Sequence, residues 1–102
     1  MEDKELLELA ANAAGLHVKV ASNSGRGLKV HGNCNWWNPL TDDGDALRLA
    51  VKLRLMVNVC PYIVIATDGN IHAEEETGKQ SDDKATRRAI TRAAAQIGKE
   101  IE

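Results

Sequence analysis

The chain has 102 residues, a formal net charge of −2 and a pI near 5.9, with 43% hydrophobic and 27% charged residues. This length suits one domain spanning residues 1–102, and the composition is that of an ordered globular protein. The small negative charge gives no general attraction for phosphate, so nucleic acid is a possible partner that the charge does not favour. No apolar run approaches the roughly 20 residues of a membrane helix. The acidic start MEDKELLELAAN is unlike a signal peptide, so we expect a cytoplasmic protein without membrane contact.

The first part of the chain predicts a helix followed by a hairpin. Apolar residues recur at helical spacing over 3–15, and Gly15 can end the helix in a left-handed conformation. Residues 16–20 and 28–31 then alternate between apolar and polar, which indicates two half-buried strands. The polar connection 21–27 contains glycines but lacks the lysine and serine of a phosphate-binding loop, so we read it as a hairpin loop.

A central helix is predicted after the stretch NWWNPLTDDGD. Thr41 or Asp42 can cap it, and the following carboxylates suit the positive end of a helix. Its apolar positions cover more than half of the circumference, so we expect it to be largely buried. These positions are Ala46, Leu47, Leu49, Ala50, Val51, Leu53, Leu55 and Met56.

The segment 57–67 is rich in strand-forming residues and is interrupted by Pro61, which predicts a bulge, an edge position or a strand starting at Tyr62. Asp68-Gly69 predicts a two-residue hairpin turn. In that turn Ala66 would face Ile71 and Val64 would face Ala73.

The last helix is predicted from Ser81 onward, with Lys84, Arg88 and Arg92 stacked on its outer face. The elements therefore follow the order α-β-β-α-β-β-α. We expect an α+β fold with a four-stranded, mainly antiparallel sheet packed with helices, as in an α-β-α sandwich.

The aspartates 42, 43 and 45 have two interpretations, a metal loop or a helix start. A calcium loop of the EF-hand type needs a different aspartate spacing and a glutamate at its twelfth position, where this chain has Leu53. The helix start is the better interpretation, and we predict no metal site there.

Trp36 and Trp37 are neighbours, so in an extended chain their side chains point to opposite sides. One can enter the core while the other lies at the surface. A surface tryptophan can anchor a protein interface or lie flat on the rim of the core, and the sequence leaves both possibilities open.

Basic residues of the last helix, Lys84, Arg87, Arg88 and Arg92, could contact phosphate or an acidic protein surface. The alternative is a solvated helix face with local pairs such as Asp83 with Arg87.

Histidines and cysteines supply the remaining candidates for chemistry. His31 and Cys34, with His17, His72 and Cys60 elsewhere, do not form the two close pairs of a zinc site. Neither cysteine lies in a catalytic signature or a C-x-x-C pair, and we expect free thiols. We therefore predict no metal, no cofactor and no enzymatic activity, with a Cys-His enzyme as the minor alternative.

Three stretches of the chain carry a resemblance to known proteins. They are WNPLTDDGDALRLAVKL (residues 37–53), ELLELAANAAGL (5–16) and ATRRAITRAAAQIG (85–98). They resemble a family of small uncharacterised bacteriophage and prophage proteins, and more distantly the phage α-β-α sandwich domain. The resemblance implies a fold and a phage origin, without catalytic residues to carry over.

Small phage proteins of this kind commonly act by binding, some as inhibitors of host defence such as anti-CRISPR proteins. Our first hypothesis is therefore a non-enzymatic accessory protein that binds a host or phage protein in the bacterial cytoplasm. Its candidate contacts are Trp36, Trp37, Asp42, Asp43, Asp45 and the loop 22–27. The alternative is a nucleic-acid-binding phage regulator that uses Lys84, Arg87, Arg88 and Arg92. The sequence does not determine the oligomeric state.

Overall fold

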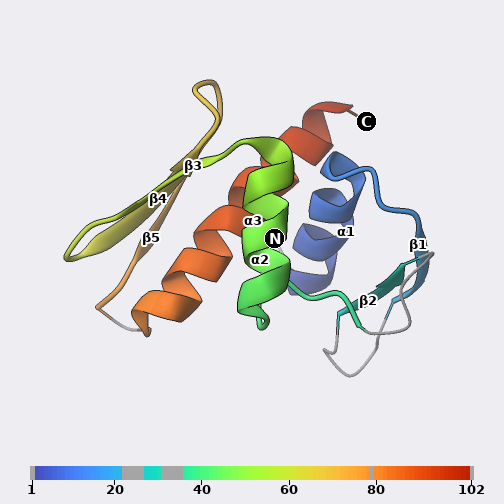
Figure 1. Ribbon diagram of the computed structural model, residues 1–102, viewed down its shortest axis with the longest axis horizontal. Helices are drawn as coiled ribbons and strands as arrows, with labels where there is room; N and C mark the ends of the chain where they lie inside the picture. The colour runs from blue at the N-terminus through green and yellow to red at the C-terminus, as the bar shows by residue number, and fades with distance from the viewer. Residues whose placement is uncertain (1, 22–26, 31–35, 79, 102) are drawn as a thin grey trace.

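The computed structural model describes residues 2–21, 27–30, 36–78 and 80–101 of the chain. Three helices and five strands make up an α+β fold, which confirms the predicted class (Figure 1). In chain order they are α1 (Asp3–Ala13), β1 (Val18–Ala21), β2 (Leu28–Val30), α2 (Asp43–Leu53), β3 (Met56–Val59), β4 (Ile63–Thr67), β5 (His72–Glu76) and α3 (Asp82–Ile101).

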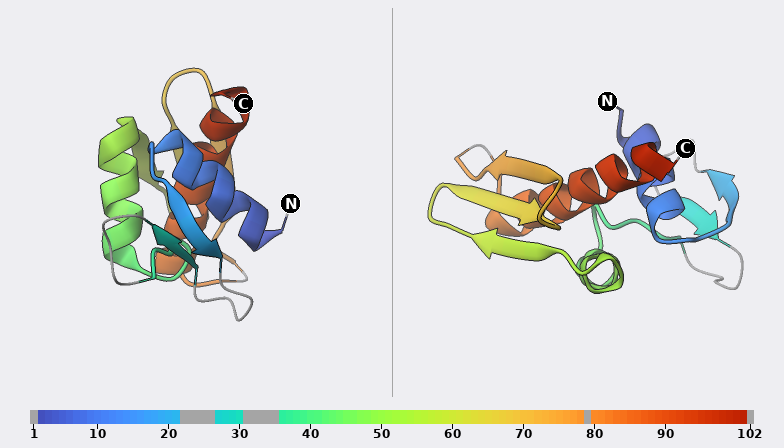
Figure 2. Two further views of the ribbon diagram at one scale, coloured as in Figure 1. Left: turned by 90° about the vertical axis from the view of Figure 1, so that its right-hand side faces the viewer. Right: turned by 90° about the horizontal axis from the view of Figure 1, so that it is seen from above.

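The predicted four-stranded sheet is wrong, because the strands form two separate antiparallel sheets. One contains β1 and β2, and the other has the order β3-β4-β5. The segment 57–67 is a hairpin rather than one strand, and Pro61, which has no N–H to donate, lies in its turn. The turn closes where the Cys60 N–H donates to the Ile63 carbonyl at 2.9 Å. The two sheets lie at opposite ends of the molecule with the helices between them (Figures 1 and 2).

Helix α3, rather than α2, is the central helix. It packs against α1, α2 and the three-stranded sheet (Figures 1 and 2). Small side chains allow these close approaches, since its buried residues are Ala85, Ala89, Ile90, Thr91, Ala93, Ala94, Ala95 and Gly98. Helix α2 buries only Asp45, Ala46, Leu49 and Ala50, so the prediction that it is buried on most of its circumference is wrong.

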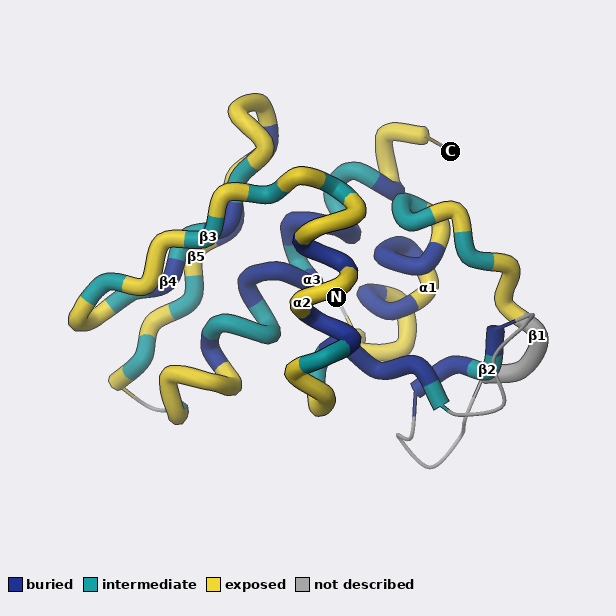
Figure 3. Tube along the Cα trace, viewed as in Figure 1, coloured by how far each residue is buried: buried dark blue, intermediate teal, exposed yellow. Residues whose placement is uncertain are grey.

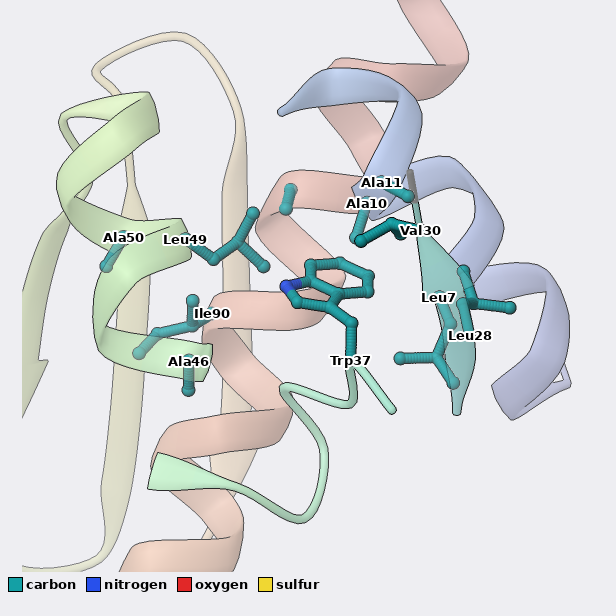
Figure 4. Close-up of a cluster of buried hydrophobic side chains, with 11 residues drawn as sticks. Leu7, Ala10, Ala11, Leu28, Val30, Trp37, Ala46, Leu49, Ala50 and Ile90 are labelled. Atoms are coloured by element: carbon teal, nitrogen blue, oxygen red, sulfur yellow. The ribbon is translucent and has the colours of Figure 1, made fainter. Parts of the chain in front are cut away.

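The core is divided between two sides of α3. On one side Trp37 lies between α1, β2 and the α2–α3 pair, in contact with a cluster of aliphatic residues (Figure 4). On the other side α3 contributes Ala85, Ala89 and Ala93 to a cluster beneath the sheet, which is completed by Val64, Ala66, Ile71 and Ala73.

The three-stranded sheet is covered by α3 on one face. Val64, Ala66 and Ala73 point to that face and are buried, while Glu74 and Asn58 on the other face are exposed. No helix from the described part of the chain packs on the second face, so this part of the molecule has two layers. The predicted α-β-α sandwich is therefore wrong for this sheet.

The β4–β5 register differs from the predicted one by two residues. Ala66 pairs with Ala73 and Thr67 with His72, which leaves a four-residue loop instead of a two-residue turn. Asp68 stabilises this loop because its Oδ1 accepts the N–H groups of Asn70 and Ile71, both at 2.8 Å. These two backbone donors, Ile71 first, lower the pKa of the Asp68 carboxyl. A shift of two residues keeps each side chain on its predicted face.

Candidate functional site

Trp37 is a core residue, which confirms that one member of the tryptophan pair enters the core. Only 7% of the residue is exposed. Its backbone N–H donates to the Leu28 carbonyl with an N···O distance of 2.7 Å, and the Leu28 N–H donates to the Trp37 carbonyl at 2.9 Å. A Cβ at Gly27 would lie 2.3 Å from the Trp37 carbonyl oxygen, so glycine is required beside this bridge. The Trp37 side chain is therefore not available to a partner.

Trp36 is the partly exposed member of the pair. The Lys29 ammonium lies 5.1 Å from the centre of its ring, a distance typical of a cation–π contact. Trp36 thus lies on the β2 side of the molecule, on a surface separate from the three-stranded sheet (Figure 1).

Asp42 and Asp45 hold the start of α2 together. The Asp42 carboxylate accepts the Asp45 N–H at 2.8 Å, which confirms the predicted cap. Asp45 is buried; its Oδ2 accepts the Asn38 N–H at 2.9 Å and its Oδ1 accepts from Arg48 at 2.7 Å. Both carboxylates therefore stabilise the start of α2.

Asp43 has a different environment. Its side chain is exposed and accepts from Arg87 of α3 at 2.6 Å. The same arginine donates through Nε to the Leu40 carbonyl at 2.9 Å. Asp43 joins α2 to α3, and it remains accessible on the outer side of α2.

The predicted basic ladder of the last helix does not form a row of unpaired cations. Its three arginines reach carboxylates on other elements: Arg87 pairs with Asp43, Arg88 with Asp3, and Arg92 with Glu75. The predicted local pair of Asp83 with Arg87 is therefore replaced by a contact between helices. Lys84 is exposed and makes no ion pair within the described residues.

Beside Arg88 and Arg92 the surface is hollowed by about 380 Å³. Glu75 and Lys99 also line this hollow. Because Glu75 already binds Arg92 and lies within 4.0 Å of Arg88, the arginine charges are partly neutralised there.

Exposed apolar residues occur along α2, β3 and the turn after β3, and the sequence did not indicate them as a site. We call this set the α2–β3 surface. Its members and their exposed fractions are Leu47 64%, Val51 69%, Met56 66%, Val59 58% and Tyr62 83%. Within β3, Met56 and Val59 lie on opposite faces of the sheet. Exposed segments follow α2 and β3 in Figure 3. One sequence signal could have indicated it: the apolar stripe of α2 is wider than one neighbouring helix can cover.

A groove of about 260 Å³ is lined mainly by α2 and α3. Helix α2 contributes Asp43, Ala46, Leu47 and Ala50, and helix α3 contributes Asp83, Thr86, Arg87 and Ile90. Val57 is the residue of β3 that lines it. The groove adjoins the α2–β3 surface at Leu47.

Metal-binding groups are not gathered in the described part of the chain. No group of three His, Cys, Asp or Glu residues there could hold a metal ion. Cys60 is a free, partly buried thiol as predicted. The candidates His31 and Cys34 and residues 22–26 of the predicted binding loop lie outside the described residues.

Of the five residues predicted to bind a partner, Trp36, Asp42 and Asp43 have accessible side chains. Asp43 lies one helical turn before Leu47 on the exposed side of α2. No helix within the described ranges is both long and apolar enough to cross a membrane. Comparisons with protein-family models, curated proteins and solved structures found no match to this chain.

Proposed function

We propose that the chain is a small non-enzymatic protein that acts by binding another protein through the outer face of α2. The observation that carries this proposal is the pair Leu47 and Val51, which lie at i, i+4 spacing and are among the most exposed aliphatic residues. Burying a leucine or valine side chain contributes about 1.5 to 3 kcal/mol. An interface that covers both side chains would therefore gain binding free energy from apolar burial that the isolated chain does not have.

The surroundings of this face support a protein partner. Asp43 precedes Leu47 by one turn, and Arg48 and Lys52 are exposed beside the apolar pair. An apolar centre with a charged rim is the usual arrangement of a protein interface. Asp43, first proposed from the sequence, would thus contact the partner at the edge of the apolar contact.

The class of partner follows from the sequence resemblance. A phage or prophage protein of this size would act in the cytoplasm of its bacterial host and bind a host or phage protein. A host defence complex is the particular partner that we propose, so that the chain would act as an inhibitor in the manner of anti-CRISPR proteins. This part of the proposal is an analogy with a class of genes.

Affinity purification with matched variants tests the proposal. The tagged chain and the double variant Leu47→Glu/Val51→Glu would be compared in host lysate, with Ile101→Glu as the control because Ile101 is also an exposed aliphatic residue. We expect the original chain and Ile101→Glu to retain the same partner and the double variant to lose it while its circular dichroism is unchanged. Equal recovery by all three proteins would show that α2 is not the binding face.

The alternative is a nucleic-acid-binding regulator that uses Lys84, Arg87, Arg88 and Arg92. It has less support, because the three arginines already bind carboxylates of the same chain. A gel-shift titration at several salt concentrations tests it, since phosphate contacts weaken steeply with ionic strength. A salt-sensitive shift that is lost on Lys84→Glu would favour this alternative.

A further inference from the structure

We infer that a second copy of the chain pairs with the free edge of β3, in antiparallel orientation, and extends the three-stranded sheet to six strands across a two-fold axis. This inference goes beyond the proposed function and does not depend on it. It rests on the composition of β3, on the direction of its backbone groups and on the residues at its two ends.

The two edges of the sheet differ in charge. Strand β5, at one edge, has the sequence HAEEE, and strand β3, at the other edge, has the uncharged sequence MVNV. Charged residues on an edge strand oppose pairing with another chain. The β5 edge therefore resists a second copy through repulsion between glutamates, and the β3 edge has no such protection.

The backbone of β3 presents hydrogen-bonding groups to this edge. The Cys60 N–H donates to the Ile63 carbonyl of the neighbouring strand. In an antiparallel ladder, alternate residues bond to the same neighbour, so Asn58 and Met56 also bond toward β4. The N–H and C=O groups of Val57 and Val59 consequently point to the free edge.

One register satisfies all four of these groups. It places Asn58 opposite the partner's Asn58, so that Val57 exchanges two hydrogen bonds with the partner's Val59 and Val59 exchanges two with the partner's Val57. A two-fold axis requires this reciprocity. No charged residue of β3 faces a like charge in this pairing.

Side chains of β3 would also become more buried in this pairing. Val57 and Val59 share the face that points toward the helices, where Val57 lines the groove and Val59 is exposed. Each valine would pack against a valine of the second copy. Exposed Met56 would lie beside the partner's Cys60 on the opposite face.

The residues at the two ends of β3 are complementary in the antiparallel pairing. Lys52 and Arg54 precede β3, and neither makes an ion pair within the described residues. At the other end lies Tyr62, which is 83% exposed. Arg54 lies four residues before Asn58 and Tyr62 four residues after it. The pairing therefore brings Arg54 to the partner's Tyr62, where a cation can contact the ring.

Cysteine cross-linking tests the register directly. Asn58 of each copy would form a non-hydrogen-bonded pair, whose Cα separation of about 4.5 Å suits a disulfide. Asn58→Cys and the control Glu74→Cys would be made in a Cys34→Ser/Cys60→Ser background, because Glu74 is exposed on the same sheet but at its other edge. On mild oxidation we expect a disulfide-linked dimer from Asn58→Cys and free monomer from Glu74→Cys. Free thiols in both variants, or equal cross-linking of both, would overturn the inference.

Sedimentation of the unmodified chain provides a second test. We expect a species of twice the 11.1 kDa chain mass at high micromolar concentration. Val59→Pro removes an outward N–H, so it should sediment as a folded monomer, while Val59→Thr keeps that N–H and should remain dimeric. A monomeric original chain at this concentration would overturn the inference. Val59→Pro retains Leu47 and Val51, so its behaviour in the affinity purification tests the proposed function separately.

Discussion

Asp42, Asp43 and Asp45 lie close together in the sequence, yet their carboxylates have different surroundings. Asp42 accepts a backbone N–H at the start of α2, and Asp45 is buried with a backbone N–H and Arg48 as its donors. Asp43 is exposed and pairs with Arg87. The sequence predicted the capping role of the group, but it could not show that Asn38 approaches Asp45, because that contact depends on the path of the chain around Pro39.

Alanine substitutions should separate these roles in urea unfolding. Asp42→Ala should lower the free energy of unfolding by about 1 kcal/mol, because the cap is lost. Asp45→Ala should lower it by about 1 to 3 kcal/mol, because a buried N–H loses its acceptor. Asp43→Ala should have the smallest effect, since an exposed ion pair contributes at most about 1 kcal/mol. A larger loss for Asp43→Ala than for Asp45→Ala would contradict these assignments, and Asp42→Asn, which can still cap, is the control.

Arg54 is the one non-glycine residue with a positive φ in the described chain, with φ 55° and ψ 45° after the last turn of α2. Its neighbour Leu55 donates to the Ala50 carbonyl at 2.9 Å, which completes the helix end. A left-handed conformation costs a side-chain-bearing residue roughly 1 to 2 kcal/mol relative to glycine. The backbone at Arg54 is therefore strained at the basic end of β3.

Replacing Arg54 by glycine should relieve this strain. We expect Arg54→Gly to be about 0.5 to 1 kcal/mol more stable than Arg54→Ala, because the greater flexibility of unfolded glycine offsets part of the gain. Both variants lose the arginine charge, so their difference in urea unfolding reports the backbone effect. Equal stability of the two variants would show that the left-handed conformation carries no cost.

The contact between α1 and α3 requires a glycine at residue 98. A Cβ at Gly98 would lie 1.9 Å from the Leu9 carbonyl oxygen. Beside it, the Asn12 side chain donates to the Gly98 carbonyl at 3.2 Å. The sequence predicted both helices, but helical periodicity does not show which of them will lie backbone to backbone.

Gly98→Ala should therefore push α1 away from α3. We expect a loss of about 1 to 3 kcal/mol or more in the free energy of unfolding, as for other overpacked sites, although alanine is the better helix former. Gly78→Ala is the matched control, because a Cβ at Gly78 would meet no atom within 4 Å. Thermal unfolding followed by circular dichroism compares the two. A Gly98→Ala protein as stable as the Gly78→Ala protein would contradict the close helix contact.

The three-stranded sheet has an uncharged strand, β3, at one edge and a charged strand, β5, at the other. The exposed apolar residues Met56 and Val59 belong to β3, and the HAEEE strand lies across the width of the sheet from them. An assembly that grows from β3 is therefore limited to two copies, because both remaining edges of the six-stranded sheet would carry glutamates. This closed arrangement predicts a defined dimer rather than an open chain of copies.

A dimer also makes stability depend on concentration. Because the second copy binds only the folded chain, the midpoint of thermal unfolding should rise as the protein concentration increases. The midpoint of the Val59→Pro variant should stay constant over the same range. A midpoint that is independent of concentration in the original chain would contradict the paired state, and calorimetry at several concentrations measures it.

Local patterns in the sequence were sufficient for much of the fold. Helical periodicity, the Gly15 stop, the Asp42 cap and the division of the tryptophan pair are consequences of nearby residues, and all agree with the structure. The alternation of residues 16–20 predicted a strand with Val18 on its apolar side, but Val18 is 41% exposed. The predicted four-stranded sheet was wrong, since β1 and β2 form a sheet of their own. Residues 57–67 also form two strands instead of one, because a proline such as Pro61 can either interrupt one strand or separate two. The hydrogen bond from the Cys60 N–H to the Ile63 carbonyl shows that the chain turns at Pro61 and forms two strands.

The sequence by itself determined the α+β class and the positions of the helices. Tertiary structure alone decided which side of each element is covered. Leu47 and Val51 have the same apolar character as Leu49 and Ala50, but α3 covers only the second pair. The arginines of α3 are likewise cations in the sequence, and only the folded chain brings Asp3, Asp43 and Glu75 to them. Burial and ion pairing depend on distant segments, so a local pattern cannot determine either of them.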